Sequence, residues 1–337
     1  MSTTSAYWDA FADVTINTLM KPQPRDPLLI IVDTTNDMNL ANACLSAAIR
    51  AGANAQLMVL PRYVSGSASD PGPIFSDAVC ASKMVLALCG GVVRAPGMMK
   101  ARDNGTRLLA SPTINKGDIE DYVIRALLDV DHEAMFRNAA LVSELWDKTK
   151  VCRVTSPQGT DVSYNLMPRK CVIGDGAISY DSEVDFFPGA QVNIAPVEET
   201  INGTIVIDAS DSIQGVVNSP YSFIMEKGVI TAVEGDKEAD LMRNYLETRN
   251  DNIIYKLCHA SIGLNPQAGI SGNMIEDERM LAALDFGFGH QDPDMGGTVG
   301  LSPYHMDIML ATPTIYLDGK EMSGGGKLNS DLGFEEV

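Results

Sequence analysis

The sequence is poor in basic residues, with 25 Lys and Arg against 44 Asp and Glu in 337 residues and a formal net charge of −19. Such a chain is a poor partner for nucleic acid or an anionic membrane, because both are themselves negatively charged. Long apolar runs are also missing, since residues 47–60 are interrupted by Arg50, Asn54 and Gln56. We therefore expect no nucleic-acid partner and no membrane-spanning helix.

Cysteine is scarce, and its spacing is not typical of a metal site or a disulfide framework. The six cysteines are Cys44, Cys80, Cys89, Cys152, Cys171 and Cys258. In a chain of this length they indicate buried thiols in a reducing compartment. The first residues also lack the basic, apolar and small-residue order of a signal peptide, so we expect a cytoplasmic location. No Gly-x-Gly-x-x-Gly fingerprint follows a strand of the first half, so we expect no nucleotide cofactor.

The first half of the chain alternates between strand and helix patterns. Residues 28–33 form an apolar run typical of a strand buried on both faces, and residues 39–52 predict a helix that Asn39 caps and Gly52 ends. Further strands are predicted at residues 55–60, 83–89 and 106–110, with helices at residues 7–20 and 118–149. This alternation predicts an α/β N-terminal domain, residues 1–150, with a mainly parallel sheet.

The second half has a different pattern, with short strands separated by Gly, Pro, Asp and Asn. Strands are predicted at residues 151–154, 160–164, 192–194, 203–208 and 221–233, the last of these a hairpin with Gly228 at its turn. Helices are expected at residues 236–250 and from Glu276 onwards, and a loop at residues 287–290. These features predict an α+β C-terminal domain, residues 151–337, with mainly antiparallel strands.

Three of the four histidines lie in the last part of the chain. His305 and Asp307 are two residues apart in an apolar run, so in a strand their imidazole and carboxylate would lie on one face. His259 lies in another strand-like run. Two imidazoles and one carboxylate, with other positions left open, are the ligands of non-haem Fe(II) oxygenases. His259, His305 and Asp307 are therefore candidate ligands of one metal ion.

The same residues allow simpler interpretations. His305 and Asp307 can form an ordinary hydrogen-bonded pair at the end of a strand, and the motif alone favours this interpretation because short motifs recur by chance. The three donors would also serve a catalytic zinc. These residues alone therefore do not decide whether the site binds iron, zinc or no metal.

Three blocks of the second half occur in a fixed order. They read PGAQVNIAPVEE at residues 188–199 with NGT at 202–204, HASIGLNP at 259–266, and GG at 296–297 with HMD at 305–307. From Val151 onwards the chain therefore resembles the C-terminal domain of the aminopeptidase T metallopeptidases. More narrowly, it resembles the 2,5-dihydroxypyridine dioxygenases that share that fold. The resemblance implies an aminopeptidase T-like fold for the second domain and its metal site.

Departures from the peptidase pattern distinguish the dioxygenases from the metallopeptidases. The peptidases place glutamate ligands where this chain has Gln191 and His259, and a histidine ligand where it has Asp285. Gln191 offers no anionic oxygen for a bridged pair of divalent ions. The positions that remain, His259, His305 and Asp307, resemble those that hold a single iron in the dioxygenases. The resemblance thus implies one Fe2+ as cofactor.

A departure in the first domain concerns the substrate. The chain resembles the dioxygenases at VVRAP, residues 92–96, and GTR, residues 105–107, but they carry an acid/base histidine where this chain has Arg94. Arginine stays protonated and cannot shuttle a proton near neutral pH. It can instead clamp a carboxylate or oxyanion of the substrate, and a surface or interdomain salt bridge is an equal alternative.

The resemblance implies a ring-cleaving dioxygenase that opens a hydroxylated N-heterocycle or related hydroxyaromatic with O2. Glu198, Asp285 and Ser261 are candidates for orienting the imidazoles, and Ser261 is counted with Arg94 among the catalytic candidates. His290 could be an acid/base residue, although a solvated loop histidine is the simpler interpretation. A homo-oligomer is implied as well.

Two other functions stay open. One is a mononuclear metallohydrolase of a small amide or peptide, in which Zn2+ activates water. The other is a non-catalytic protein that has kept the fold, against which the intact set of three ligands argues. Iron with O2-dependent turnover would distinguish the dioxygenase from a zinc hydrolase that needs no oxygen.

Overall fold

The computed structural model describes residues 3–62, 71–111, 118–178, 183–291 and 293–337. Close contacts divide the chain into two units. Unit 1 comprises Met1–Val130 and Gly174–Gly189, and unit 2 comprises Asp131–Ile173 and Ala190–Val337. This division differs from the single boundary expected at residue 150, because one segment of the second half returns to unit 1.

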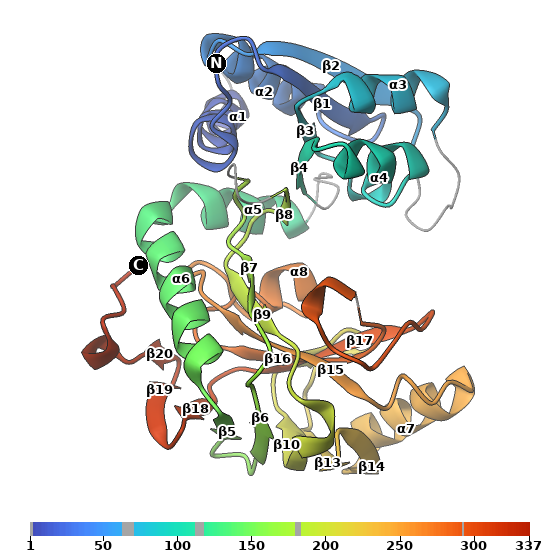
Figure 1. Cartoon of the computed structure of the whole chain (residues 1–337), viewed down its shortest axis with the longest axis vertical. Helices are drawn as coiled ribbons and strands as arrows, with labels where there is room; N and C mark the ends of the chain where they lie inside the picture. Colours follow the sequence, from blue (N-terminus) through green and yellow to red (C-terminus); the bar gives the residue numbers. More distant parts are fainter. Residues whose placement is uncertain (1–2, 63–70, 112–117, 179–182, 292) are drawn as a thin grey trace. The chain divides into compact units, whose positions relative to one another are not determined.

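Unit 1 contains a five-stranded sheet in the order β2-β1-β3-β4-β8 (Figure 1). Its strands are β1 (Pro27–Asp33), β2 (Asn54–Leu60), β3 (Met84–Ala87), β4 (Arg107–Ala110) and β8 (Val184–Phe186). All neighbouring pairs are parallel. In β1 the residues after Pro27 are buried, which explains the apolar run of the sequence. The predicted α/β class with a parallel sheet is confirmed.

Helices of unit 1 precede or follow these strands. They are α1 (Thr3–Val14) with its π-helical continuation Thr15–Met20, α2 (Met38–Arg50), α3 (Pro73–Ala81), α4 (Pro96–Asp103) and α5 (Asp118–Leu128). The expected cap of α2 was wrong, because Asp37 precedes the helix and its carboxylate accepts the backbone N–H of Asn39.

One sheet of unit 2 has eight strands in the order β14-β13-β10-β6-β5-β18-β19-β20, with every neighbouring pair antiparallel. The strands are β5 (Val151–Thr155), β6 (Asp161–Asn165), β10 (Asn202–Ile207), β13 (Tyr221–Glu226), β14 (Val229–Glu234), β18 (Thr314–Leu317), β19 (Lys320–Gly324) and β20 (Lys327–Leu328). Lys227 and Gly228, both with positive φ, form the predicted turn between β13 and β14.

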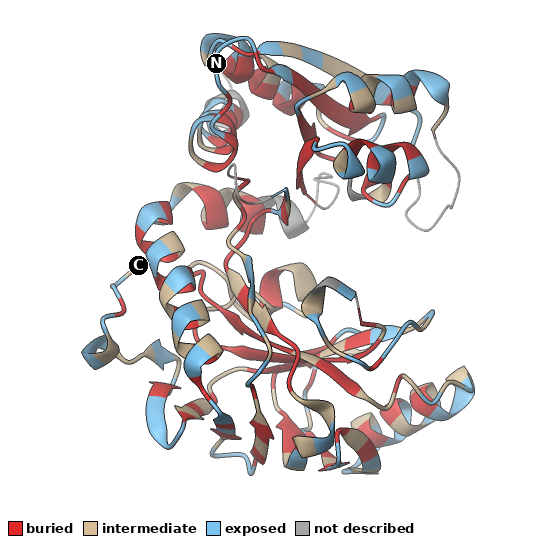
Figure 2. Ribbon diagram, in the orientation of Figure 1, coloured by how far each residue is buried: buried red, intermediate tan, exposed pale blue. Residues whose placement is uncertain are grey.

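The other sheet of unit 2 has seven strands in the order β12-β11-β17-β16-β15-β9-β7. They are β7 (Val172–Gly174), β9 (Gln191–Ile194), β11 (Ser210–Asp211), β12 (Gly215–Val216), β15 (Leu257–Gly263), β16 (Leu284–Gly289) and β17 (His305–Leu310). Phe286 and Phe288 of β16 make edge-to-face contacts with Tyr164 and Phe223 of the eight-stranded sheet. The two sheets therefore pack through apolar faces, and the central strands are buried (Figure 2).

The helices of unit 2 are α6 (His132–Lys148), α7 (Lys237–Arg249) and α8 (Met274–Asp277). Two expectations near the site were wrong. The helix expected to begin at Glu276 is a single turn that ends at Asp277. The loop expected at residues 287–290 is mostly strand, because Gly287 and Gly289 belong to β16, where glycine permits the close approach of other groups.

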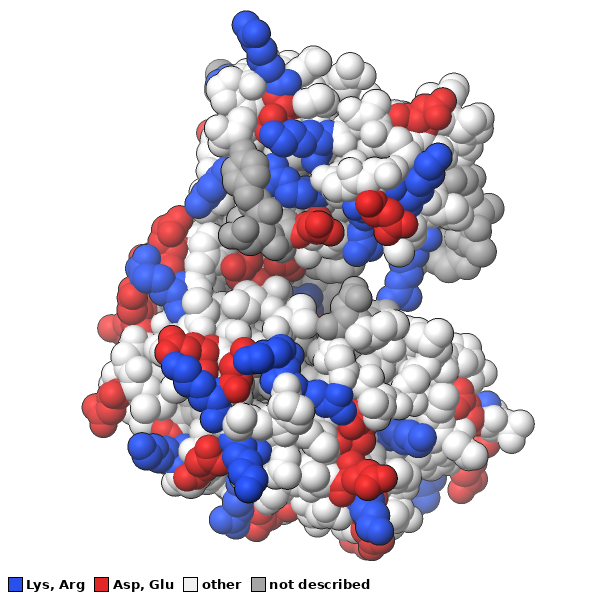
Figure 3. Space-filling model, viewed as in Figure 1, with Lys and Arg blue, Asp and Glu red and all other residues white. Residues whose placement is uncertain are grey.

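The surface of each unit carries both signs of charge. On the face drawn in Figure 3, Lys and Arg side chains are interspersed with Asp and Glu. Within the described ranges, none of the helices combines the length and apolarity needed to cross a bilayer.

Candidate metal centre

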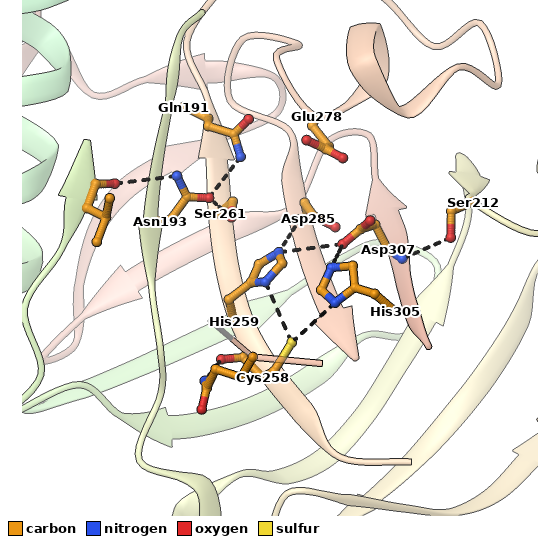
Figure 4. A network of polar contacts seen from close by, with 12 residues as sticks. Gln191, Asn193, Ser212, Cys258, His259, Ser261, Glu278, Asp285, His305 and Asp307 are labelled. Carbon is orange, nitrogen blue, oxygen red and sulfur yellow. Dashed lines mark hydrogen bonds and ion pairs between the residues drawn. The ribbon is translucent and has the colours of Figure 1, made fainter. Parts of the chain in front are cut away.

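The register of three neighbouring strands brings the predicted ligands together. His259 of β15 lies opposite Gly287 of β16, which lies opposite Asp307 of β17. His305 is two residues before Asp307 and therefore lies on the same face of β17. The side chains of His259, His305 and Asp307 converge on the polar face of the sheet (Figure 4).

The carboxylate of Asp307 lies between the two imidazoles. Its Oδ1 is 2.9 Å from His305 Nε2 and 3.6 Å from His259 Nε2. The two rings are nearly parallel, with centroids 5.3 Å apart and an angle of 24° between their planes. Three donor atoms of the types that bind divalent transition metals therefore face one another.

A second carboxylate belongs to the same cluster. Asp285 Oδ2 lies 2.9 Å from His259 Nε2, and the donor atoms of His259, Asp285 and Asp307 lie within 4.8 Å of one another. Asp285 is 1% exposed, and its Oδ1 has no hydrogen-bond partner among the described residues. A buried carboxylate oxygen without a donor is costly unless a cation or proton satisfies it.

Gly287 gives the His259 ring its position. A Cβ on residue 287 would overlap the His259 imidazole atoms, so the ring occupies the space beside the backbone of Gly287. The ring can therefore adopt this position only because residue 287 has no side chain.

The opposite edges of the two rings have their own partners. The Nδ1 of His305 lies 2.9 Å from the carbonyl oxygen of His290, which can accept its proton. Cys258 Sγ lies 3.6 Å from His259 Nδ1 and 3.9 Å from His305 Nδ1. Metal-binding histidines usually donate their other ring N–H to such groups, which leaves Nε2 to the metal.

A β-bulge explains why Cys258 lies beside His259. Leu257 pairs with Phe288 and His259 with Gly287, so Cys258 is an extra residue in β15. In a bulge the strand is locally re-aimed, and adjacent side chains no longer alternate regularly.

The electrostatics of the cluster favour positive charge between the carboxylates. Burial would lower the pKa of His305, but its contacts with Asp307 and Cys258 raise that pKa to about 11. Burial is likewise outweighed at His259, where Cys258 and Asp285 raise the pKa well above its usual value. Burial would raise the pKa of Asp307, but the two imidazoles lower it. The site thus stabilises charge of the sign that a metal cation carries.

Burial and the neighbouring carboxylates raise the pKa of two further carboxyl groups. Burial, together with Asp307, raises the pKa of Asp285 to about 6. Burial raises the pKa of Glu278 to about 8, although its partner Arg279, at 2.5 Å, opposes the rise. This shift favours the neutral form of Glu278, which limits the negative charge near Asp307 and Asp285.

Ser261 lies two residues after His259 on the same face, and it is fully buried. Its hydroxyl donates to Asn193 Oδ1 at 2.5 Å, and Gln191 Nε2 donates to the same oxygen at 2.8 Å. The Oε1 of Gln191 has no hydrogen-bond partner among the described residues. These three side chains form a polar wall beside the cluster (Figure 4).

The other candidates lie apart from the imidazole–carboxylate cluster. The His290 ring contacts the backbone of Ser302, and its backbone carbonyl reaches His305. Glu198 pairs with Arg169 at 2.6 Å and accepts the N–H of Thr298, so neither of these contacts is to an imidazole. Arg94 is an exposed residue of unit 1. Catalytic roles for Arg94, His290 and Ser261 stay predictions.

Three residues that shape the cluster, Cys258, Gly287 and Glu278, were not among those predicted from the sequence. The alternation of glycine with phenylalanine in DFGFG, residues 285–289, was a signal for a strand, but glycines are also common in loops. The positions of Cys258 and Glu278 depend on a bulge and on a chain turn that the sequence pattern does not reveal.

The residues present fit a divalent transition metal. Two imidazole nitrogens and one carboxylate oxygen face a common point, a second carboxylate oxygen lies beside them, and the buried Asp285 Oδ1 lacks a donor among the described residues. Imidazole and carboxylate together suit iron, zinc and similar ions.

Comparison with known proteins identifies the family of the chain. The sequence profile of the family described as 2,5-dihydroxypyridine 5,6-dioxygenase matches residues 10–330. The chain is 28% identical over 196 residues to a 2,5-dihydroxypyridine 5,6-dioxygenase of Pseudomonas putida, a match that covers 55% of this chain and 55% of that relative. This alignment therefore spans about half the length of the curated relative.

Solved structures show the fold. The structure of the 2,5-dihydroxypyridine dioxygenase of Pseudomonas putida superposes with a TM-score of 0.75 at 21% identity, covering 98% of this chain and 99% of that one. Wild-type AmpT of Thermus thermophilus superposes with a TM-score of 0.65 at 16% identity, covering 97% and 100%. The predicted aminopeptidase T-like fold is confirmed. Because the family profile covers nearly the whole sequence, the chain belongs to the 2,5-dihydroxypyridine 5,6-dioxygenase family.

Proposed function

We propose that this protein is an Fe2+-dependent dioxygenase that cleaves the ring of a hydroxylated N-heterocycle such as 2,5-dihydroxypyridine. The observation that carries the proposal is the convergence of His259 Nε2 and His305 Nε2 on the carboxylate of Asp307. Family membership supplies the reaction class, and the name of the Pseudomonas relative supplies the substrate class.

In this proposal His259, His305 and Asp307 hold the iron. A bound Fe2+ with open positions would bring the oxygens of the substrate and O2 together and carry electrons between them. The protein's part is to fix the ligands before the reactants arrive. Gly287 leaves the space that the His259 ring occupies, and the His290 carbonyl keeps the proton of His305 on Nδ1.

The polar wall beside the cluster would orient the substrate. Ser261 and Gln191 both donate to Asn193 Oδ1, and these two hydrogen bonds fix the orientation of the Asn193 amide. Gln191 Oε1 is buried and has no hydrogen-bond partner among the described residues, and in this proposal it accepts a ring N–H or hydroxyl of the substrate. A heterocycle that carries both a ring N–H and a hydroxyl group could donate hydrogen bonds to this polar wall.

The proposal is tested first by metal content and oxygen consumption. Protein purified without added metal or chelator is assayed for iron and zinc by mass spectrometry, then loaded anaerobically with Fe2+ and mixed with 2,5-dihydroxypyridine in air-saturated buffer. We expect about one iron per chain and O2 uptake in proportion to substrate consumed. Zinc with oxygen-independent amide hydrolysis would instead establish the hydrolase.

Two histidine variants separate a ligand from a structural residue. His305→Ala should lose iron and O2 uptake together, because Nε2 is a donor. His132→Gln changes a buried histidine of α6 that makes none of the contacts of the cluster, and it should keep both. Full iron content in His305→Ala would contradict the assignment. The homo-oligomer and the cytoplasmic location stay proposals, the first to be checked by light scattering.

A further inference from the structure

We infer that Gln191 selects the N–H form of the substrate ring, and that Ser261 and Asn193 are positioning residues that set the direction of its amide. This inference rests on the proposed function and adds which form of the ring the site takes. A 2-hydroxypyridine ring exists as a lactim, with a bare ring nitrogen and a hydroxyl, or as a lactam, with a ring N–H and a carbonyl.

The three side chains lie on the face of the sheet that carries the metal centre. Ser261 of β15 pairs with Asn193 of β9 on one side and with Asp285 of β16 on the other. His259 lies two residues before Ser261, and Gln191 lies two residues before Asn193, so the members of each pair share a face. The polar wall is therefore a continuation of the face that presents His259 and Asp285 (Figure 4).

The amide of Asn193 has one favourable orientation. Its Nδ2 donates to the carbonyl oxygen of Val172 at 3.4 Å. Its Oδ1 accepts the Ser261 hydroxyl at 2.5 Å and the Nε2 of Gln191 at 2.8 Å. The reversed amide would bring its oxygen against the Val172 carbonyl and its NH2 group against that of Gln191.

The orientation of Asn193 determines that of Gln191. Because the Gln191 NH2 group donates to Asn193, its Oε1 points away from Asn193. This oxygen is buried and has no hydrogen-bond partner in the described part of the chain. A buried acceptor without a donor is costly, and a ligand that brings a donor to it removes that cost.

The donor that best suits Gln191 is the ring N–H of a lactam. In the proposed function a substrate oxygen binds the metal, so the ring N–H is the donor that remains for the wall. The lactim form would instead bring the lone pair of its ring nitrogen against the lone pairs of Oε1. A benzene ring with the same two oxygens, as in hydroquinone, has a C–H at this position and would leave Oε1 unpaired.

Ser261 acts through the two amides and not on the substrate itself. Without its hydroxyl, Asn193 Oδ1 loses one of its two donors. The amides of Asn193 and Gln191 can then turn together, and Gln191 would present NH2 in place of Oε1. Ser261 therefore affects ligand choice only as long as residue 191 carries an amide.

The test measures ligand binding by the full-length protein loaded with Co2+ under argon. Dissociation constants for 2,5-dihydroxypyridine and hydroquinone are obtained by absorption titration, and their ratio measures the preference for the ring N–H. The variants are Gln191→Met, Ser261→Ala and the double variant. Ser323→Ala is the matched control, because Ser323 is also a fully buried strand serine but lies on β19 of the other sheet.

We expect the wild type to bind the pyridine at least about 10-fold more tightly than hydroquinone. Gln191→Met should remove most of this preference, and Ser323→Ala should keep it. Ser261→Ala should reduce the preference in the wild-type background and have no further effect on it in the Gln191→Met background. A merely structural role of Ser261 would change both backgrounds alike. A fixed lactim, 5-hydroxy-2-methoxypyridine, should bind no more tightly than hydroquinone.

Three results would overturn the inference while O2 uptake with 2,5-dihydroxypyridine still supports the proposed function. They are equal binding of the pyridine and hydroquinone by the wild type, equal effects of Ser261→Ala in the two backgrounds, and binding of the fixed lactim as tight as that of 2,5-dihydroxypyridine. Absence of O2 uptake by the wild-type protein loaded with Fe2+ would overturn the proposed function, and the inference with it.

Discussion

At the scale of single residues, the centre depends as much on a missing side chain as on the donors. The His259 ring occupies the space where a Cβ of residue 287 would lie. His259 and Asp307 are thereby brought together across an intervening strand, because Gly287 is the residue between them in the register. Any larger residue at 287 must push the imidazole out of its plane.

The variant Gly287→Ala tests this point. We expect it to weaken Co2+ or Fe2+ binding by about 10-fold or more, because the His259 Nε2 is displaced, with overpacking costing about 1–3 kcal/mol of stability. Equilibrium dialysis and urea denaturation measure the two effects. Gly269→Ala is the control, since the nearest atom to its added Cβ is at 3.9 Å. Unchanged metal affinity in Gly287→Ala would refute this role.

The titration of the imidazoles predicts how metal binding depends on pH. The pKa of His305 is raised to about 11 and that of His259 is raised well above its usual value, so both shifts favour the protonated rings before metal binds. A cation must displace these protons, so affinity should fall as pH decreases and rise as pH increases. The slope should approach two decades per pH unit when two protons are released.

Calorimetric titration with Co2+ between about pH 6 and pH 8 gives this slope, and buffers of different ionisation enthalpy give the number of protons released. The variant His305→Ala should show a smaller slope if it retains weak binding. A dissociation constant that does not change with pH would contradict the prediction.

The sequence predicted that His305 and Asp307 share one face because strand alternation is a local rule, whereas their grouping with His259 depended on the resemblance to the dioxygenases. His305 and Asp307 needed only a period of two. The orientation of Asp285 toward Nε2, and the extra residue at Cys258, depend on how neighbouring strands pair. Pairing is a long-range property, so the sequence pattern did not contain it.

At the scale of elements, β16 is the central strand of the site. It pairs with β15, which carries His259, and with β17, which carries His305 and Asp307. Its residues alternate between the polar face, at Asp285 and Gly287, and the apolar face, at Phe286 and Phe288. The glycines made this segment resemble a loop, whereas the two aromatic residues at alternate positions mark a strand. The apolar face attaches the metal-binding strands to the other sheet.

The variant Phe288→Ala should therefore destabilise unit 2. Phe288 is fully buried and contacts Phe223 with ring centroids 5.4 Å apart. Truncation should cost about 3–5 kcal/mol in the free energy of unfolding measured in urea. Leu301→Ala, at a residue that is 66% exposed, should change it by less than about 0.5 kcal/mol. Equal effects of the two variants would show that this face of β16 does not anchor the sheet.

At the scale of the whole molecule, neither unit is one continuous stretch of the sequence. The segment Gly174–Gly189 lies between two parts of unit 2, yet its strand β8 pairs with β4 of unit 1. Helix α6 comes before residue 150 but belongs to unit 2. The change in the sequence pattern near residue 150, from alternating strands and helices to short strands, marks where the antiparallel strands begin. It does not mark the end of unit 1.

This organisation predicts the behaviour of fragments. A fragment of residues 1–150 lacks β8 and exposes the buried side chains of α6, including Trp146. We expect it to melt without a cooperative transition in circular dichroism. The matched fragment joins residues 1–130 to 174–189 through a glycine–serine linker, and it should melt cooperatively. The opposite order of the two fragments would contradict the division into these units.

The bulge at Cys258 has a consequence for which single-residue deletion the strand can accept. Leu257 and His259 pair with adjacent residues of β16, so both would keep their present faces if the codon for Cys258 were deleted. In an unbulged strand, a one-residue change exchanges the two faces. Deletion of Cys258 would therefore remove the sulfur beside the two Nδ1 atoms while the register keeps His259 on the face of the metal centre.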